Sequence, residues 1–237
     1  MLRLRIAPSH ESEFFHVNPT QELKLNHPHA GHPTPLARRA FSLAAALAFG
    51  CALASPCAAE DAKTIATTIC IACHGEDGNS SIPMFPKIAG LQEGYILKQL
   101  RDFQSGRRKS GIMEPVVAGL KVEDFAPLAA LYSSQKIRPG TDADKKAAAF
   151  GKMVYFEGNE ETGVPACVGC HQPQGTGHLI YPRIGGQHGT YVTQQLKSFA
   201  SGERSNDVSR FMRVTAKRMN EEEIESVAAY LAGLGGQ

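Results

Sequence analysis

Two copies of the pattern Cys-x-x-Cys-His carry the clearest chemistry in this chain of 237 residues. The first copy is Cys70–His74 and the second is Cys167–His171. This pattern is the attachment signature of c-type haem. Cysteines three residues apart on one helical turn face the same side, so both can reach the vinyl groups of one porphyrin, and the adjacent histidine projects toward the iron. We therefore expect two covalent haem c groups, attached at Cys70, Cys73, Cys167 and Cys170, with His74 and His171 as iron ligands.

Other uses of paired cysteines explain the sequence less well. A thioredoxin-like redox pair needs a strand–helix–strand context, which is not recognisable around either pair. Two Cys-x-x-Cys pairs can share one zinc ion, but the ligand pairs of compact zinc sites lie much closer together in sequence. Two disulfides would suit an oxidising compartment, but the spacing of the four cysteines argues against them. Chance is excluded because the pattern occurs twice inside a longer repeat.

The chain around the two motifs is an internal repeat. Residues 85–90, Phe-Pro-Lys-Ile-Ala-Gly, match residues 181–186, Tyr-Pro-Arg-Ile-Gly-Gly, at an offset of 96. The same offset relates Tyr95, Gln99, Leu100, Phe103, Ser105 and Gly106 to Tyr191, Gln195, Leu196, Phe199, Ser201 and Gly202. A repeat of this length indicates a duplicated domain. Each copy is too small for a large core, and an apolar cofactor at its centre would supply buried surface.

Two methionines are candidates for the sixth iron ligand. Met113 and Met212 occupy equivalent positions in the repeat, each just before the last amphipathic segment of its copy. A methionine there can also be core filler, but these two stay in register while their neighbours differ. Methionine–histidine ligation fills both axial positions of a haem iron and raises its reduction potential. Such an iron transfers electrons and has no vacant position for a substrate.

The remaining histidines and methionines fit less well as ligands. His178 and His188 have no counterpart in the first copy, and we interpret them as surface or propionate-side histidines. Met219 is matched by Leu120, which favours a packing role, and Met84 is matched by nothing.

The hydrophobic pattern predicts helices and no strands. The last segment of each copy places apolar residues at i, i+3, i+4 and i+7, which forms one apolar stripe on a helix. The stripes are Phe125, Leu128, Ala129 and Tyr132 in one copy, and Ile224, Val227, Ala228 and Leu231 in the other. Asn220 can cap the second helix together with Glu223, whereas its counterpart Lys121 cannot accept the capping bond. Further helices are predicted over about 61–70, 93–104, 143–157 and 189–200.

The first 59 residues are predicted to be a leader. Two arginines precede an apolar run over 40–54, and small residues follow as far as Ala59, which is the pattern of a secretory signal peptide. An uncleaved anchor is the alternative. Pro139-Gly140 between polar residues marks a linker. We therefore divide the chain into a leader at 1–59, a first domain at 60–138 and a second domain at 139–237.

The charge of the chain argues against some classes of partner. There are 25 lysines and arginines against 23 aspartates and glutamates, and the formal net charge of +2 points to neither nucleic acid nor a membrane surface. Basic residues nevertheless gather in sequence beside the candidate methionines, namely Arg107, Arg108 and Lys109, and Arg210, Arg213, Lys217 and Arg218. We hypothesise that they orient an acidic redox partner at the haem edges.

Together these motifs resemble the cytochrome c4 family, the two-domain members of the class I c-type cytochromes. The specific marks are Cys73–Ser80 (CHGEDGNS), Phe85–Gly90 (FPKIAG) and Gly185–His188 (GGQH). The resemblance extends over essentially all of residues 60–237. It implies an all-α fold of two tandem cytochrome c-like helical domains, each around one covalent haem.

The resemblance also carries functional expectations. It implies a periplasmic dihaem carrier, often membrane-associated, that shuttles single electrons between respiratory-chain partners such as a quinol-oxidising complex and a terminal oxidase. By the family pattern Met113 and Met212 are the distal iron ligands. One departure is Leu91, which stands where the second domain has Gln187, and it affects fine packing rather than haem binding.

Two rival functions stay open. The chain can be a dedicated electron-transfer subunit of one dehydrogenase or oxidase complex, because the sequence names no partner. A dihaem enzyme is less favoured. Dihaem peroxidases are larger and need one open iron, and thiosulfate-oxidising cytochromes use a cysteine as a distal ligand. Outside the expected leader the chain has only the four motif cysteines, so we expect an electron carrier and not an enzyme.

Overall fold

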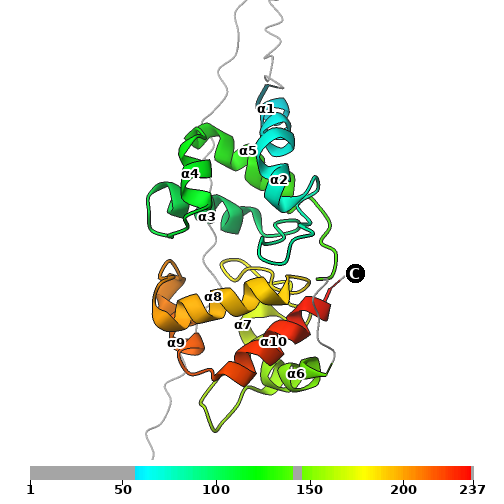
Figure 1. Ribbon diagram of the computed structural model, residues 1–237, viewed down its shortest axis with the longest axis vertical. Coiled ribbons are helices and arrows are strands. Elements are labelled where there is room, and N and C mark those ends of the chain that lie inside the picture. Colours follow the sequence, from blue (N-terminus) through cyan, green and yellow to red (C-terminus); the bar gives the residue numbers. More distant parts are fainter. Residues whose placement is uncertain (1–56, 141–145, 236–237) are drawn as a thin grey trace, which may run out of the picture. The chain divides into compact units, whose positions relative to one another are not determined.

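The computed structural model describes residues 57–140 and 146–235, which are built from helices (Figure 1). We call 57–140 the N-half and 146–235 the C-half. The helices of the N-half are α1 (Cys57–Ile65), α2 (Ile71–His74), α3 (Glu93–Gln104), α4 (Met113–Ala118) and α5 (Val122–Ser133). Those of the C-half are α6 (Ala147–Glu157), α7 (Val168–His171), α8 (Gly189–Ser201), α9 (Phe211–Ala216) and α10 (Glu221–Gly233). These two ranges contain no strand beyond two isolated bridges, which confirms the predicted all-α fold.

The two halves repeat one order of elements. A long helix leads to a short motif helix, a second long helix follows, then a short helix carrying the candidate methionine, and finally the striped helix. The predicted spans 93–104 and 189–200 match α3 and α8 closely. The predicted span 61–70 divides into α1 and a π-helical turn η1 (Ala66–Cys70), which runs directly into α2.

The core of the N-half lies between α1, α3 and α5. All four residues of the predicted α5 stripe, Phe125, Leu128, Ala129 and Tyr132, are buried there. They pack with Ile96 and Phe103 of α3. Among the described side chains of α1 and η1, Ala62 and Ala66 are buried, and their small size allows the backbone of this segment to approach α5 closely.

The core of the C-half lies between α6, α8 and α10. The predicted stripe of Ile224, Val227, Ala228 and Leu231 is buried against Val154 and Tyr155 of α6 and Leu196 of α8. The backbones of α6 and α10 approach each other closely at Gly151 of α6. A Cβ atom there would lie 1.8 Å from the carbonyl oxygen of Ser226, so only glycine allows α6 and α10 to pack at this distance.

The two striped helices begin in different ways. Asn220 caps α10 as predicted, because its side chain accepts the Glu223 N–H at 2.9 Å and the Glu223 carboxylate accepts the Asn220 N–H at 2.8 Å. At the start of α5 the Lys121 side chain cannot accept a bond, but the Asp124 carboxylate accepts the Lys121 N–H at 2.9 Å. The first helix therefore has one half of this reciprocal arrangement, which the sequence interpretation had overlooked.

Most of the predicted leader lies outside the described residues, and so do residues 141–145, which follow the predicted linker dipeptide Pro139-Gly140. The apolar run over 40–54 is among the residues not described, and α1 begins at Cys57, within the segment assigned to the leader. The start of the predicted helix over 143–157 is also not described, and α6 begins at Ala147. Among the helices of the described ranges, none has the length and apolar character to cross a membrane.

Candidate functional site

The first motif lies where η1 passes into α2. Cys70 ends η1, and Cys73 and His74 lie in α2. The helix ends at His74, and the next residue, Gly75, has a φ of 76°. A positive φ suits glycine because it has no Cβ atom. His74 is only 7% exposed, and its Nδ1 lies 2.8 Å from the carbonyl oxygen of Pro86. Because a carbonyl can only accept, Nδ1 carries the proton and Nε2 keeps a free lone pair for a metal.

The second motif repeats this arrangement in α7. His171 is 6% exposed, and its Nδ1 donates to the carbonyl oxygen of Pro182 at 2.9 Å. The chain leaves α7 at Gln172, whose φ of 68° is unusual for a residue other than glycine. The backbone oxygen of Gln172 accepts a hydrogen bond from the buried Tyr155 hydroxyl, which holds this turn against α6.

The electrostatics of the motifs suit iron binding rather than thiol redox chemistry. Burial lowers the pKa of His74 and of His171, and the hydrogen bonds to the proline carbonyls offset only part of that effect. Both rings are therefore neutral, as a metal ligand must be. Burial also raises the pKa of Cys70, and it raises the pKa of Cys167 to about 11. A redox-active Cys-x-x-Cys pair shows the opposite shift, so the thioredoxin-like alternative is disfavoured.

The structure brings each candidate methionine to the same core as the first cysteine of its motif. Met113 is the first residue of α4, and both it and Cys70 pack against the N-half core. Met212 lies in α9, and both it and Cys167 pack against the C-half core. In the C-half, aromatic rings lie between the two ligand positions. The ring centroids of His171 and Tyr181 are 6.3 Å apart, and those of Tyr181 and Phe211, the neighbour of Met212, are 6.5 Å apart.

Large apolar side chains are exposed in the segments that carry these residues. In the N-half they are Ile69, Ile71, Ile82, Met84 and Ile112. In the C-half they are Leu179, Ile180, Val208, Phe211 and Val214. Exposed apolar side chains on this scale mark a surface that another group covers. A porphyrin is large, flat and apolar, so the residues present fit a haem in each half.

Comparison with known proteins tests the resemblance directly. The cytochrome c family profile matches residues 59–146 and, a second time, residues 148–235. Over 172 residues the chain is 44% identical to cytochrome c4 of Thiocapsa roseopersicina, and the alignment covers 71% of this chain and 88% of that protein. The chain belongs to the cytochrome c4 family.

A solved structure supports the same assignment. The crystal structure of cytochrome c4 from Pseudomonas stutzeri matches with a TM-score of 0.70 at 39% sequence identity, covering 74% of this chain and 98% of that one. As a cytochrome c4, this protein is an electron carrier with two covalently bound haem c groups, which confirms the predicted cofactors. A more distant relative is the thiosulfate dehydrogenase electron acceptor of Stutzerimonas stutzeri strain A1501, 34% identical over 174 residues, 72% of this chain and 81% of that protein.

The two halves are joined by a reciprocal network of hydrogen bonds, which the sequence did not predict. The Arg108 guanidinium donates to Gln99 of its own half at 2.8 Å, and across the interface to the Tyr191 hydroxyl at 2.8 Å and Gln195 at 2.9 Å. The guanidinium carbon of Arg108 also lies over the Phe103 ring, 4.7 Å from the ring centroid. The docking hypothesis is therefore wrong for Arg108, which is buried and bonded to the other half.

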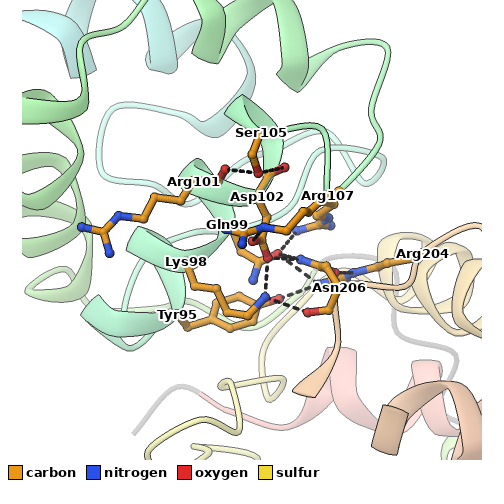
Figure 2. Close-up of polar contacts among 10 residues, drawn as sticks. Tyr95, Lys98, Gln99, Arg101, Asp102, Ser105, Arg107, Arg204 and Asn206 are labelled. Atoms are coloured by element: carbon orange, nitrogen blue, oxygen red, sulfur yellow. Dashed lines mark hydrogen bonds and ion pairs between the residues drawn. The ribbon is translucent and has the colours of Figure 1, made fainter. Parts of the chain in front are cut away.

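Arg204 makes the equivalent contacts with the two halves exchanged. It donates to Gln195 of its own half at 2.6 Å, and across the interface to the Tyr95 hydroxyl at 3.0 Å and to Gln99 at 3.3 Å. Figure 2 shows Arg204 and Asn206 reaching the polar side chains of α3. The repeat offset of 96 could have indicated this role, because it relates Arg108 to Arg204.

Asp102 is the buried acid of this interface. Its carboxylate accepts from Lys98 and, across the interface, from Asn206 Nδ2 at 2.7 Å, and it pairs with Arg107 at 3.0 Å (Figure 2). Burial alone would raise the pKa of Asp102, but the hydrogen bonds from Lys98 and Asn206 and the nearby cations together hold that pKa below its ordinary value. The carboxylate is therefore charged at neutral pH. Two exposed cations of the first basic segment are already engaged with acids, Arg107 with Asp102 and Lys109 with Glu114 at 3.6 Å.

The two histidines outside the motifs that lie in the described residues have different surroundings. His178 is exposed, as the interpretation of a surface histidine requires, and its backbone pairs with Tyr181. His188 is fully buried, and its Nε2 lies 2.9 Å from the carbonyl oxygen of Ser80 in the other half. Of the two roles predicted for His188, the surface position is therefore wrong, and a position beside a haem propionate stays a prediction. This ring forms part of the contact between the halves.

Proposed function

We propose specific roles for the residues of the two haem sites. Cys70 and Cys73 form the thioethers of the first haem, and His74 and Met113 are its axial ligands. Cys167 and Cys170 form the thioethers of the second haem, and His171 and Met212 are its axial ligands. The observation that carries this proposal is the buried histidine of each motif, whose Nδ1 is held by a proline carbonyl at 2.8 and 2.9 Å so that Nε2 is left for iron.

We also propose that the protein works in the periplasm as a carrier of single electrons between respiratory partners, toward a terminal oxidase. The predicted signal peptide supports this localisation, and methionine–histidine iron suits an outer-sphere carrier. The domains are proposed at 60–138 and 139–237, after a leader at 1–59. Three exposed cations near Met212, namely Arg210, Lys217 and Arg218, favour an acidic partner. Peripheral membrane association is compatible with this role.

One relative favours a second candidate function. The protein from Stutzerimonas stutzeri strain A1501 is named a thiosulfate dehydrogenase electron acceptor. Our alternative proposal is therefore that this chain serves one dehydrogenase as its dedicated electron-accepting subunit. The haem chemistry is the same in both cases, and the partner differs.

Haem stoichiometry tests the proposed attachment. Two haems should remain with the polypeptide through acid–acetone extraction, because thioether bonds survive it. In a variant with Cys70→Ser and Cys73→Ser, intact mass should show one haem only, and the same should hold for Cys167→Ser with Cys170→Ser. Two retained haems in either double variant would overturn the assignment of those cysteines.

Reoxidation kinetics test the proposed partner. Reduced protein should be reoxidised rapidly when it is mixed with membrane vesicles that contain a terminal oxidase and expose their periplasmic face. The second-order rate should fall as salt rises, because exposed charges are screened over roughly 10 Å at 0.1 M ionic strength. A matched experiment follows reduction of the oxidised protein by a thiosulfate dehydrogenase. Fast reduction there, with no turnover by the oxidase, would reject the shuttle in favour of the dedicated subunit.

A further inference from the structure

The loop that orients each motif histidine is held by a glutamine of the other half. In the N-half, the carbonyl of Pro86 accepts the His74 Nδ1–H at 2.8 Å. The N–H of the next residue, Lys87, donates to Gln187 Oε1 at 2.9 Å, and Gln187 Nε2 donates back to the Lys87 carbonyl at 2.8 Å. Lys87 and Gln187 are 3% and 6% exposed, so no water competes strongly for these bonds.

The C-half has the reciprocal arrangement. The carbonyl of Pro182 accepts the His171 Nδ1–H at 2.9 Å, and the N–H of Arg183 donates to Gln92 Oε1 at 2.9 Å. Gln92 Nε2 also donates to the carbonyl of Thr176 at 2.6 Å, which fixes the amide in this orientation.

By the repeat offset, Gln187 corresponds to Leu91 and not to Gln92. Adjacent positions of the two halves therefore supply the same contact.

The two bonds of each set meet on one peptide group. The carbonyl of a residue and the N–H of the next residue belong to the same planar, conjugated unit. A hydrogen bond at the N–H polarises this unit and makes its carbonyl a stronger acceptor, as in other hydrogen-bond chains. Each chain therefore runs from a glutamine side chain, through one peptide group, to the histidine of the opposite half.

We propose that Gln187 and Gln92 are positioning residues that tune the haem of the half to which they do not belong. This inference rests on the proposed role of His74 and His171 as iron ligands. A stronger acceptor at Nδ1 makes the imidazole a better electron donor and favours ferric iron, because outer partners of a ligating histidine set its orientation and basicity. Each glutamine therefore lowers the reduction potential of the haem across the interface.

The test replaces each glutamine with leucine, the residue that the N-half already has at position 91. Gln187→Leu should raise the potential of the N-half haem alone, and Gln92→Leu that of the C-half haem alone. We expect about a threefold to tenfold change in the ratio of reduced to oxidised haem at fixed applied potential, where tenfold corresponds to about 59 mV for one electron. Met113→His identifies the N-half wave, because it replaces that haem's proposed distal ligand.

A second readout follows the peptide groups themselves. Amide hydrogen exchange should accelerate at Lys87 in Gln187→Leu and at Arg183 in Gln92→Leu, and not in the opposite variant.

Gln104→Leu and Gln194→Leu are matched controls, because both glutamines are exposed on α3 and α8. Tyr191→Phe removes a different bond between the halves without changing charge. None of the three controls should shift one haem selectively.

Several outcomes would overturn the inference. Equal shifts of both haems in each glutamine variant, or a like shift in Tyr191→Phe, would mean that the glutamines only hold the halves together. Unchanged potentials would show that the hydrogen-bond chain has no electronic effect. If one variant fails to fold, the other tests the crossed pattern from its own side. Wild-type protein with fewer than two haems, or without methionine–histidine spectra, would instead reject the proposed ligands.

Discussion

Replacing Met212 with alanine should remove about half of the weak near-infrared absorption that ferric methionine-ligated haem shows, and Met113→Ala should remove the other half. Each variant should also lower the potential of its own haem strongly, by up to a few tenths of a volt, because axial ligands set haem potentials over about 0.8 V. A thioether stabilises ferrous iron, and its loss leaves the site to water or another ligand. Optical redox titration of each variant measures both effects.

Met219→Leu is the matched control for the methionine variants. Met219 is buried in the C-half core, and exchanging methionine for leucine conserves volume, so the near-infrared band should persist in full. A complete band in Met212→Ala would show that another residue binds the iron. His178 is exposed and His188 is bonded to Ser80, so neither could replace the methionine without rearrangement of its surroundings.

Gly151→Ala should destabilise the C-half by about 3 kcal/mol or more, at or beyond the upper end of the usual penalty for overpacking. The added Cβ would lie 1.8 Å from the Ser226 oxygen, 2.3 Å from the Ser226 carbonyl carbon and 2.8 Å from the Val227 nitrogen. All three are backbone atoms of α10, so no side chain can move aside. Denaturant unfolding, followed by helical circular dichroism and by haem absorbance, measures the loss.

Gly94→Ala is the matched control for this substitution. Gly94 lies in α3, and a Cβ atom there would meet nothing within 4 Å. Alanine favours a helix over glycine by about 1 kcal/mol, so this variant should be as stable as the wild type or more stable. Equal stability of Gly151→Ala and the wild type would show that α6 and α10 can separate without cost, which contradicts the packing described.

The sequence predicted the parts of the fold that depend on local spacing. The two motifs, the stripes on α5 and α10, and the Asn220 cap each depend on residues within one or two helical turns, and the structure confirms the stripes and the cap. Internal repetition added a second source of information, since Met113 and Met212 are recognisable mainly because they recur in register.

Most contacts between the halves were not predicted, although the repeat offset that relates Arg108 to Arg204 marks these two residues as equivalent. Arg108 follows Arg107 in a basic segment, and nothing local distinguishes an exposed cation from one whose partners are Tyr191 and Gln195. Similarly, Leu91 marked a departure from Gln187, but only the structure shows that Gln92 makes the equivalent contact. Distant partners decide the surroundings of such residues, and a sequence without its fold does not reveal them.

The reciprocal bonds of Arg108 and Arg204 have a consequence for the association of the halves. Each half supplies an arginine, a tyrosine and a glutamine to the same contact, so each surface is complementary to its own copy. Interfaces of this kind are isologous and are typical of two-fold dimers. A free half would thus have every group needed to self-associate, and the fraction associated would depend on its concentration. Covalent connection replaces that dependence with a fixed effective concentration, of millimolar order for a short flexible tether. The pairing of two haems then survives dilution.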